Sequence, residues 1–208
     1  KTIGDYAFGD CTGLKSAVLK DGIGSIGEYI FNRCTAIESI TLPYAGPSLE
    51  SVNKADSSQY VVTRLFNGSV SDKTYGVNYT YNRYVPNSLK KITITGGTRI
   101  PSYAFDGFKG VTEIVVPESI TSIGNYAFRN CSSMTSANLT NKLVSIGNYA
   151  FSGCSSSKLS SVKFPSSLTS IGAYAFSGCA GLTSIEVPGT VKTIGDYAFG
   201  DCTGLKSA

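Results

Sequence analysis

The sequence predicts a right-handed repeat solenoid with one parallel β-sheet, short strands on the opposite side and one-turn helices between them. The first observation is the phrase Ile-Gly-x-Tyr-x-Phe, which recurs along the 208 residues and is usually followed, after two more residues, by a cysteine. The second is a short run of alternating apolar residues after each phrase. Because a fixed short period marks units that bury their apolar faces only against neighbours, we expect about eight stacked coils.

Seven copies of the phrase can be aligned, six ending in cysteine and one in phenylalanine. They lie at Ile3–Cys11, Ile26–Cys34, Ile100–Phe108, Ile123–Cys131, Ile146–Cys154, Ile171–Cys179 and Ile194–Cys202. Copies that abut directly are 23 residues apart, except for a two-residue insertion between Ile146 and Ile171. One copy therefore corresponds to one coil.

The phrase itself predicts a short helical turn. The position after Ile-Gly mostly holds short polar residues such as Asp5 and Asn125, which accept hydrogen bonds from free N–H groups where a helical turn begins. The position before the cysteine holds Gly, Asn or Asp in all copies but one, and these residues tolerate the left-handed conformation that ends such a turn. Pro101 replaces the glycine after isoleucine in one copy, so close packing explains that glycine better than a positive φ.

A strand follows each turn. In one coil Ile185 and Val187 alternate with polar residues, which is typical of a half-buried strand, and Pro188 then removes a donor and ends the ladder. A second apolar pair, such as Leu168 and Ile171, predicts a short extended stretch on the opposite side. Stacked coils would place adjacent parallel strands about 4.8 Å apart.

Aromatic residues and cysteines each recur at one position per coil. We expect the phenylalanines to be core residues and the tyrosines to be half-buried with their hydroxyls at the rim, although a stacking platform is an alternative. We expect the cysteines to be buried free thiols, because one thiol per coil cannot converge tetrahedrally on zinc and in-register side chains do not easily reach a disulfide dihedral. They are Cys11, Cys34, Cys131, Cys154, Cys179 and Cys202.

The chain is expected to be a single solenoid over residues 1–208, and its period breaks at residues 44–88. We interpret this segment as an irregular tyrosine-rich insertion around one degenerate coil, with Leu65–Gly68 as its turn and Leu89–Thr95 as its strand. The insertion either covers an edge of the solenoid or binds a ligand, since tyrosine offers a flat apolar face with a polar tip. The candidate ligand-binding residues are Tyr75, Tyr79, Tyr81, Arg83 and Tyr84.

The outward positions of the strands are rich in hydroxyls and poor in charge. We expect Lys15 to lie beside Glu38, and Lys163 beside Glu186, across neighbouring coils. We interpret this surface first as a solvated sheet, and we expect recognition to map to the tyrosine-rich insertion rather than to the sheet. The surface is neither a phosphate clamp nor a hydrophobic groove.

Composition argues against several classes of function. The chain has no histidine and a net charge of only +4, so no metal, no cofactor and no nucleic-acid partner is expected. No apolar run approaches the ~18 residues that a membrane span needs, so no membrane insertion of this segment is expected. The carboxylates of the insertion, Glu50, Asp56 and Asp72, have no partner base in view, and we do not expect an enzyme.

The repeats resemble the BspA-like (Treponema-type) leucine-rich repeats, whose pattern is close to LxxIxLPxxLxxIGxxAFxxC. The resemblance covers Ile3–Leu42 and Leu89–Ala208. It implies a curved solenoid in a protein at the cell surface or outside the cell that binds a host or neighbour-cell protein or glycan. The expected function is therefore a non-enzymatic binding or adhesion module. The alternative is a structural spacer in a long tandem-repeat surface protein or filament.

The two ends of the chain carry the same sequence. Lys1–Ala17 and Lys192–Ala208 are identical, including exposed-type residues such as Asp5 and Lys15. Coils in the interior agree mainly at apolar and turn positions. We therefore expect the chain to be part of a longer array, with end-to-end continuation in which the tyrosine-rich insertion recurs.

Overall fold

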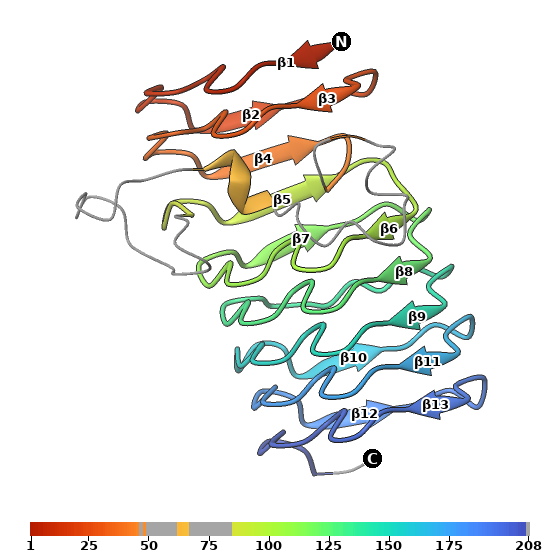
Figure 1. Ribbon diagram of the computed structural model, residues 1–208. Coiled ribbons are helices and arrows are strands. Elements are labelled where there is room, and N and C mark those ends of the chain that lie inside the picture. Colours follow the sequence, from red (N-terminus) through yellow and green to blue (C-terminus); the bar gives the residue numbers. More distant parts are fainter. Residues whose placement is uncertain (46–47, 49–61, 67–84, 207–208) are drawn as a thin grey trace.

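The computed structural model describes residues 1–45, 48, 62–66 and 85–206. These residues wind into a stack of coils with the two ends of the chain at opposite ends of the stack (Figure 1). The stack has about seven turns rather than eight, because the first and last coils are part turns. Among the described residues the single helix is the 3₁₀ helix η1, Val62–Leu65. The predicted parallel solenoid is confirmed.

The longer strands form parallel sheets on one side of the coil. The first sheet has the order β2-β4-β5-β7, and β10 pairs separately with β12. These strands are β2 (Ser16–Val18), β4 (Ser39–Leu42), β5 (Lys91–Ile94), β7 (Glu113–Val115), β10 (Ser161–Lys163) and β12 (Ser184–Glu186). Equivalent residues pair, as in Ile40↔Ile92 and Ile92↔Ile114, so each strand contributes the same positions to the core.

Two-residue strands form the second set of parallel ladders. One sheet has the order β13-β11-β9-β8-β6, and β1 pairs with β3. These strands are β1 (Thr2–Ile3), β3 (Ser25–Ile26), β6 (Arg99–Ile100), β8 (Ser122–Ile123), β9 (Ser145–Ile146), β11 (Ser170–Ile171) and β13 (Thr193–Ile194). Isoleucines from this side and from the longer strands belong to one hydrophobic cluster, so the core runs through the whole stack.

The long-strand side is interrupted between β7 and β10, where no strand forms in the coil that follows Cys131. Ala137 stands in that coil at the position that Ile185 fills in a later one. A void of about 10 Å³ lies there, lined among others by Met134, Ala137 and Phe128.

The predicted one-turn helices are wrong, because Tyr-Ala-Phe forms a tight turn that is not helical. Every tyrosine at this position has a positive φ, between 51° and 61°. Each residue before the cysteine, or before Phe108 in its place, also has a positive φ, between 54° and 76°. A left-handed φ costs a residue with a side chain roughly 1–2 kcal/mol. The turn makes hydrogen bonds to the next coil instead, from Tyr126 N to Asn148 O at 2.9 Å and from Phe128 N to Ala150 O at 2.7 Å. Two such bonds contribute roughly 0.5–1.5 kcal/mol each and offset the cost.

The polar residues after Ile-Gly also act between coils and not within a turn, which corrects the capping prediction. The Oδ1 atom of Asn125 accepts from Asn148 N at 2.8 Å, and that of Asn148 accepts from Ala173 N at 2.9 Å. Asp5 accepts in the same way from Glu28 N at 2.8 Å. Each side chain thus satisfies a backbone donor that the short strands leave unpaired.

The glycine after isoleucine is required by close packing, as predicted. A Cβ atom added to Gly147 would lie 2.7 Å from Asn125 N and 2.6 Å from its Oδ1. The same addition to Gly195 would lie 2.3 Å from Ala173 N. All three distances are shorter than van der Waals separation, because consecutive coils touch through their backbones at this point.

Gly147→Ala is therefore expected to lower the free energy of unfolding by about 1–3 kcal/mol, the usual cost of overpacking. Gly4→Ala is the matched control, since a Cβ at Gly4 has nothing within 4 Å. The two free energies would be compared by urea unfolding. Equal losses at both positions would show that the backbone conformation, and not the contact with the preceding coil, demands glycine.

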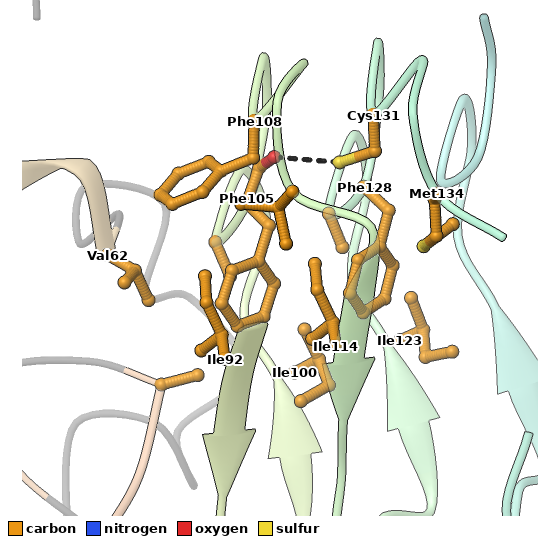
Figure 2. Packing of buried hydrophobic residues seen from close by; sticks show 14 of the residues in the cluster. Val62, Ile92, Ile100, Phe105, Phe108, Ile114, Ile123, Phe128, Cys131 and Met134 are labelled. Atoms are coloured by element: carbon orange, nitrogen blue, oxygen red, sulfur yellow. Dashed lines mark hydrogen bonds between the residues drawn. The ribbon is translucent and has the colours of Figure 1, made fainter. Parts of the chain in front are cut away.

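The phenylalanines form the predicted core column. Phe128 stacks between Phe105 and Phe151, with ring centroids 5.2 and 4.9 Å away, and is 4% exposed. Figure 2 shows the Phe105 and Phe128 rings packed against isoleucines from both sets of strands. In the coil that contains η1, Phe66 continues the column at 5.8 Å from Phe31.

Candidate binding surface

The tyrosine-rich site predicted from the sequence lies outside the described residues. Its members are Tyr75, Tyr79, Tyr81, Arg83 and Tyr84. The insertion's first residue, Tyr44, is described, and it is 2% exposed within the core. Burial also raises the pKa of the Tyr44 phenol. Tyr44 belongs to the packing of the solenoid. The ligand-binding role of the five residues of the predicted site remains a prediction.

The outward side chains of β2, β4, β5, β7, β10 and β12 form a surface that we call the sheet face. Three charged groups in its N-terminal half have partners within their own chain. Lys91 Nζ lies 3.0 Å from Glu113 Oε1, and Lys90 Nζ donates to the carbonyl of Asn87 at 2.7 Å. Lys15 and Glu38, at the N-terminal end of this surface, are exposed.

The C-terminal half of the sheet face is rich in hydroxyls and contains a shallow depression of about 530 Å³. The depression is lined by Ser161, Val162, Lys163, Phe164, Ser184, Ile185, Glu186 and Pro188. Lys163 and Glu186 are register partners, as predicted, and both are exposed. One cation, one anion and two serines beside a flat backbone suit a polar, weakly charged ligand such as a peptide or a glycan. They do not suit a phosphate group, which is typically bound by several cationic side chains or N–H donors and by no nearby carboxylate.

The tyrosines of the turns form a second surface feature, which we call the tyrosine ladder. Its rings are Tyr103, Tyr126, Tyr149, Tyr174 and Tyr197, with successive centroids 4.8, 4.9, 4.8 and 5.2 Å apart. The first four are half-buried, as expected for rings with hydroxyls at the rim, and Tyr197 is 68% exposed. Each inner ring has both faces covered by its neighbours. The ladder therefore offers ring edges to a partner and not the open faces of a stacking platform.

An ion pair with a buried carboxylate and a partly exposed guanidinium lies next to the ladder. Arg129 donates to Asp106 through Nε at 2.9 Å and Nη2 at 2.6 Å, and Asp106 is 1% exposed. The Cζ atom of the guanidinium also lies 4.7 Å from the centroid of the Tyr126 ring. Sequence analysis missed this pair. Both residues directly follow the phenylalanine of their coil, so comparing that position between neighbouring coils would have revealed opposite charges.

The thiols form a hydrogen-bonded column. Cys131 Sγ donates to the carbonyl of Phe105 at 3.2 Å (Figure 2), and Cys154 and Cys179 donate equivalently to Phe128 and Phe151. All six cysteines are free, as predicted. Five are buried, but Cys11 is exposed, which corrects the expectation that every thiol is buried. Burial raises the pKa of the Cys131 and Cys154 thiols well above the ordinary value.

A thiol reagent is therefore expected to modify Cys11 in the folded chain and to leave the five buried thiols unmodified. The thiolate is the reactive form, and burial disfavours it. Mass mapping of the labelled peptides, with and without denaturant, gives the pattern directly. Labelling of Cys154 at the rate of Cys11 would contradict the buried column.

Stability is also expected to fall at alkaline pH. Burial raises the pKa of the Cys34 thiol from 9.0 to about 11, and that of Cys202 likewise to about 11. Because the folded chain holds these protons more tightly, their contribution is complete below pH 9 and is lost as the pH rises toward 11. Urea midpoints across this window measure the slope, and Cys34→Ala should reduce it. A slope unchanged by that substitution would assign the loss to other groups.

Within the described ranges, no three His, Cys, Asp or Glu side chains gather where they could hold a metal ion. A search of the same residues finds no helix with the length and apolar character of a membrane span.

Solved structures of repeat proteins resemble this chain. A leucine-rich repeat protein from Bacteroides ovatus is 30% identical with a TM-score of 0.64, and the match covers 100% of this chain and 45% of that one. A leucine rich cell surface protein from Faecalibacterium prausnitzii is 22% identical with a TM-score of 0.54, over 99% and 62% of the two chains. The T. pallidum leucine rich repeat protein is 23% identical with a TM-score of 0.54, over 99% and 72%.

This chain therefore spans less than half of the Bacteroides ovatus protein that it matches. No curated protein matches its sequence. The BspA type leucine rich repeat region matches residues 1–71 and 78–206, in 6 copies. That match includes the isoleucine, phenylalanine and cysteine columns on which the fold is built, and the chain belongs to the BspA-type leucine-rich-repeat family.

Proposed function

We propose that the chain is a non-enzymatic module that binds a protein or a glycan at the cell surface or outside the cell. The observation that carries this proposal is the depression on the sheet face, where two exposed strands present hydroxyls and a single pair of opposite charges. Such a surface is open and shallow, which suits an extended polymer better than a small substrate. The surface location is supported by membership of the family and by the name of the Faecalibacterium prausnitzii cell surface protein.

Two serine hydroxyls of the depression are available for a ligand, whereas threonines on the same side of the coil are already engaged. Thr183 Oγ1 already donates to the carbonyl of Ser160 at 3.1 Å, and Thr135 Oγ1 to that of Thr112 at 3.1 Å. Ser161 and Ser184, by contrast, lie on neighbouring strands with exposed side chains. A peptide or sugar hydroxyl that bridges them would add hydrogen bonds without breaking the threonine contacts.

The predicted tyrosine site offers a second location for recognition of the same ligand class. Tyrosine side chains supply large contact areas at low entropic cost, and insertions in repeat arrays are often where binding residues lie. Substitutions at one location should leave binding at the other location unchanged, so one set of affinity measurements distinguishes them.

The test is a binding screen of the full chain against immobilised glycans and extracellular-matrix proteins, followed by affinity measurements on variants. Lys163→Ser with Glu186→Ser should weaken binding about tenfold or more if the depression is the site. Tyr79→Ser with Tyr81→Ser should do so if the insertion is the site. Lys15→Ser, at the far end of the sheet face, is the matched control and should bind normally.

Full affinity in both double variants would overturn the binding proposal for these residues. Absence of any ligand in the screen would favour the alternative, a structural spacer in a longer surface protein. One observation favours that alternative. The cysteines, the phenylalanines and the polar residues after Ile-Gly all make contacts between coils, which stiffen the stack as a structural spacer requires.

A further inference from the structure

We propose that the tyrosine ladder is a site of oxidative cross-linking. A peroxidase-type one-electron oxidant would join neighbouring tyrosines across adjacent coils as dityrosine. The inference rests on the geometry of Tyr103, Tyr126, Tyr149, Tyr174 and Tyr197, and is independent of the proposed binding function.

The rings of the ladder are held in register. Tyr149 and Tyr174 have centroids 4.8 Å apart and ring planes within 1° of parallel. The backbone fixes this arrangement, because Tyr149 N donates to Ala173 O and Tyr174 N to Asp196 O, both at 2.9 Å. Two phenols that cannot separate behave as reactants at a very high effective concentration. Radicals formed on neighbours should therefore couple with each other rather than with other chains.

The hydroxyl edge of the ladder is open to an oxidant. Tyr149 and Tyr174 are half-buried and Tyr197 is 68% exposed. Desolvation is the main cause that raises the pKa of the Tyr174 phenol, and charge repulsion from Tyr149 and Tyr197 raises this pKa further. The parallel stacking of Tyr149, Tyr174 and Tyr197 holds the three rings in register. The phenylalanine column, by contrast, is buried and has no hydroxyl to oxidise.

The chemistry balances with hydrogen peroxide as the electron acceptor. Each phenol loses one electron and one proton, which gives two phenoxyl radicals. A carbon–carbon bond forms between ring carbons ortho to the oxygens, and the two displaced ring hydrogens move to the oxygens and restore the phenols. Two electrons and two protons leave in total, and one peroxide takes them up as two molecules of water.

A cross-link would staple neighbouring coils in a chain that has no disulfides. Linking Tyr126 to Tyr149 closes a loop in the unfolded chain, which removes conformational freedom from that state as a disulfide does. The ladder is interrupted between Tyr29 and Tyr103 by the coil of residues 62–66, which contains no tyrosine. Tyr6 and Tyr29 form a separate pair, 5.3 Å apart but tilted by 39°. We therefore expect links within the ladder and none from Tyr29 to Tyr103.

The experiment treats the full chain, at low concentration, with a haem peroxidase and hydrogen peroxide. Dityrosine fluorescence gives the yield, and mass spectrometry of proteolytic peptides gives the linked pairs, each two hydrogens lighter than its parts. The folded chain should give on the order of tenfold more intramolecular dityrosine than the urea-unfolded chain. Ladder neighbours should account for most of it, and the thermal midpoint should rise after cross-linking.

Tyr149→Phe is the decisive variant, because it keeps the stacked ring and removes the reactive hydroxyl. Tyr149 takes part in two of the four ladder pairs, with Tyr126 and with Tyr174. Those two links should vanish in the variant, while Tyr103–Tyr126 and Tyr174–Tyr197 remain. Tyr44→Phe, a buried tyrosine outside the ladder, is the matched control and should leave the yield unchanged. An equal yield from folded and unfolded chains would overturn the proposal. Links mapped mainly between chains, or between tyrosines outside the ladder, would overturn it as well.

Discussion

Phe128→Ala is expected to lower the free energy of unfolding by about 3–5 kcal/mol, among the largest effects of any single substitution in this chain. The ring is 4% exposed and lies between Phe105 at 5.2 Å and Phe151 at 4.9 Å. Removing it would leave a cavity that opens both contacts at once, in the middle of the stack where neither adjacent coil can close the gap. Urea unfolding followed by far-ultraviolet circular dichroism measures the loss.

Phe199→Ala is the matched control for this substitution. Phe199 is only half-buried, and within the column it stacks on Phe176 alone, at 5.4 Å. Its removal exposes less new surface, so we expect a clearly smaller loss. Equal losses at the two positions would mean that the energy resides in the local turn and not in stacking on both sides.

Arg129→Ala is expected to have an effect of similar size, about 3–5 kcal/mol, because it leaves the Asp106 carboxylate buried without its partner. Asp106 is 1% exposed and receives both guanidinium hydrogen bonds, at 2.9 and 2.6 Å. The loss of the guanidinium contact with the Tyr126 ring adds to the cost. Chemical unfolding again gives the magnitude.

Two further variants separate the buried charge from other causes. Lys91→Ala breaks an ion pair of 3.0 Å whose side chains are 48% and 41% exposed, and should cost less than about 1 kcal/mol. Replacing both members of the buried pair, with Asp106→Leu and Arg129→Leu, should recover much of the loss. If Arg129→Ala were as mild as Lys91→Ala, the Asp106 carboxylate would be less isolated from water than the structure indicates.

Much of the fold follows from the sequence because the repeat supplies its own alignment. Once Ile123, Ile146 and Ile171 are recognised as equivalent, a shared register places them side by side, as β8, β9 and β11 do. The same comparison predicts the buried phenylalanine and cysteine columns.

The candidate binding surface is less well determined. The tyrosines predicted to bind a ligand lie outside the described residues, while the depression of the sheet face arises where Lys163 and Glu186 meet in register. Their adjacency was predictable from the period, but a concave surface depends on how the coils pack and cannot be inferred from spacing alone. The Asp106–Arg129 pair required a comparison of one position between two neighbouring coils.

The sequence by itself determined the solenoid, the register of its coils and the residues that enter its core, since all three depend on a period that can be counted along the chain. Tertiary structure decided the conformation of the turns and the partners of their polar groups. The Tyr-Ala-Phe segment suits a helical turn locally, yet each tyrosine adopts a positive φ, and the N–H of every one but Tyr197 donates to the adjacent coil. Asn125 likewise accepts from Asn148 N, 23 residues further along the chain. Such partners become neighbours only when the coils stack, so no local rule of helix capping could identify them.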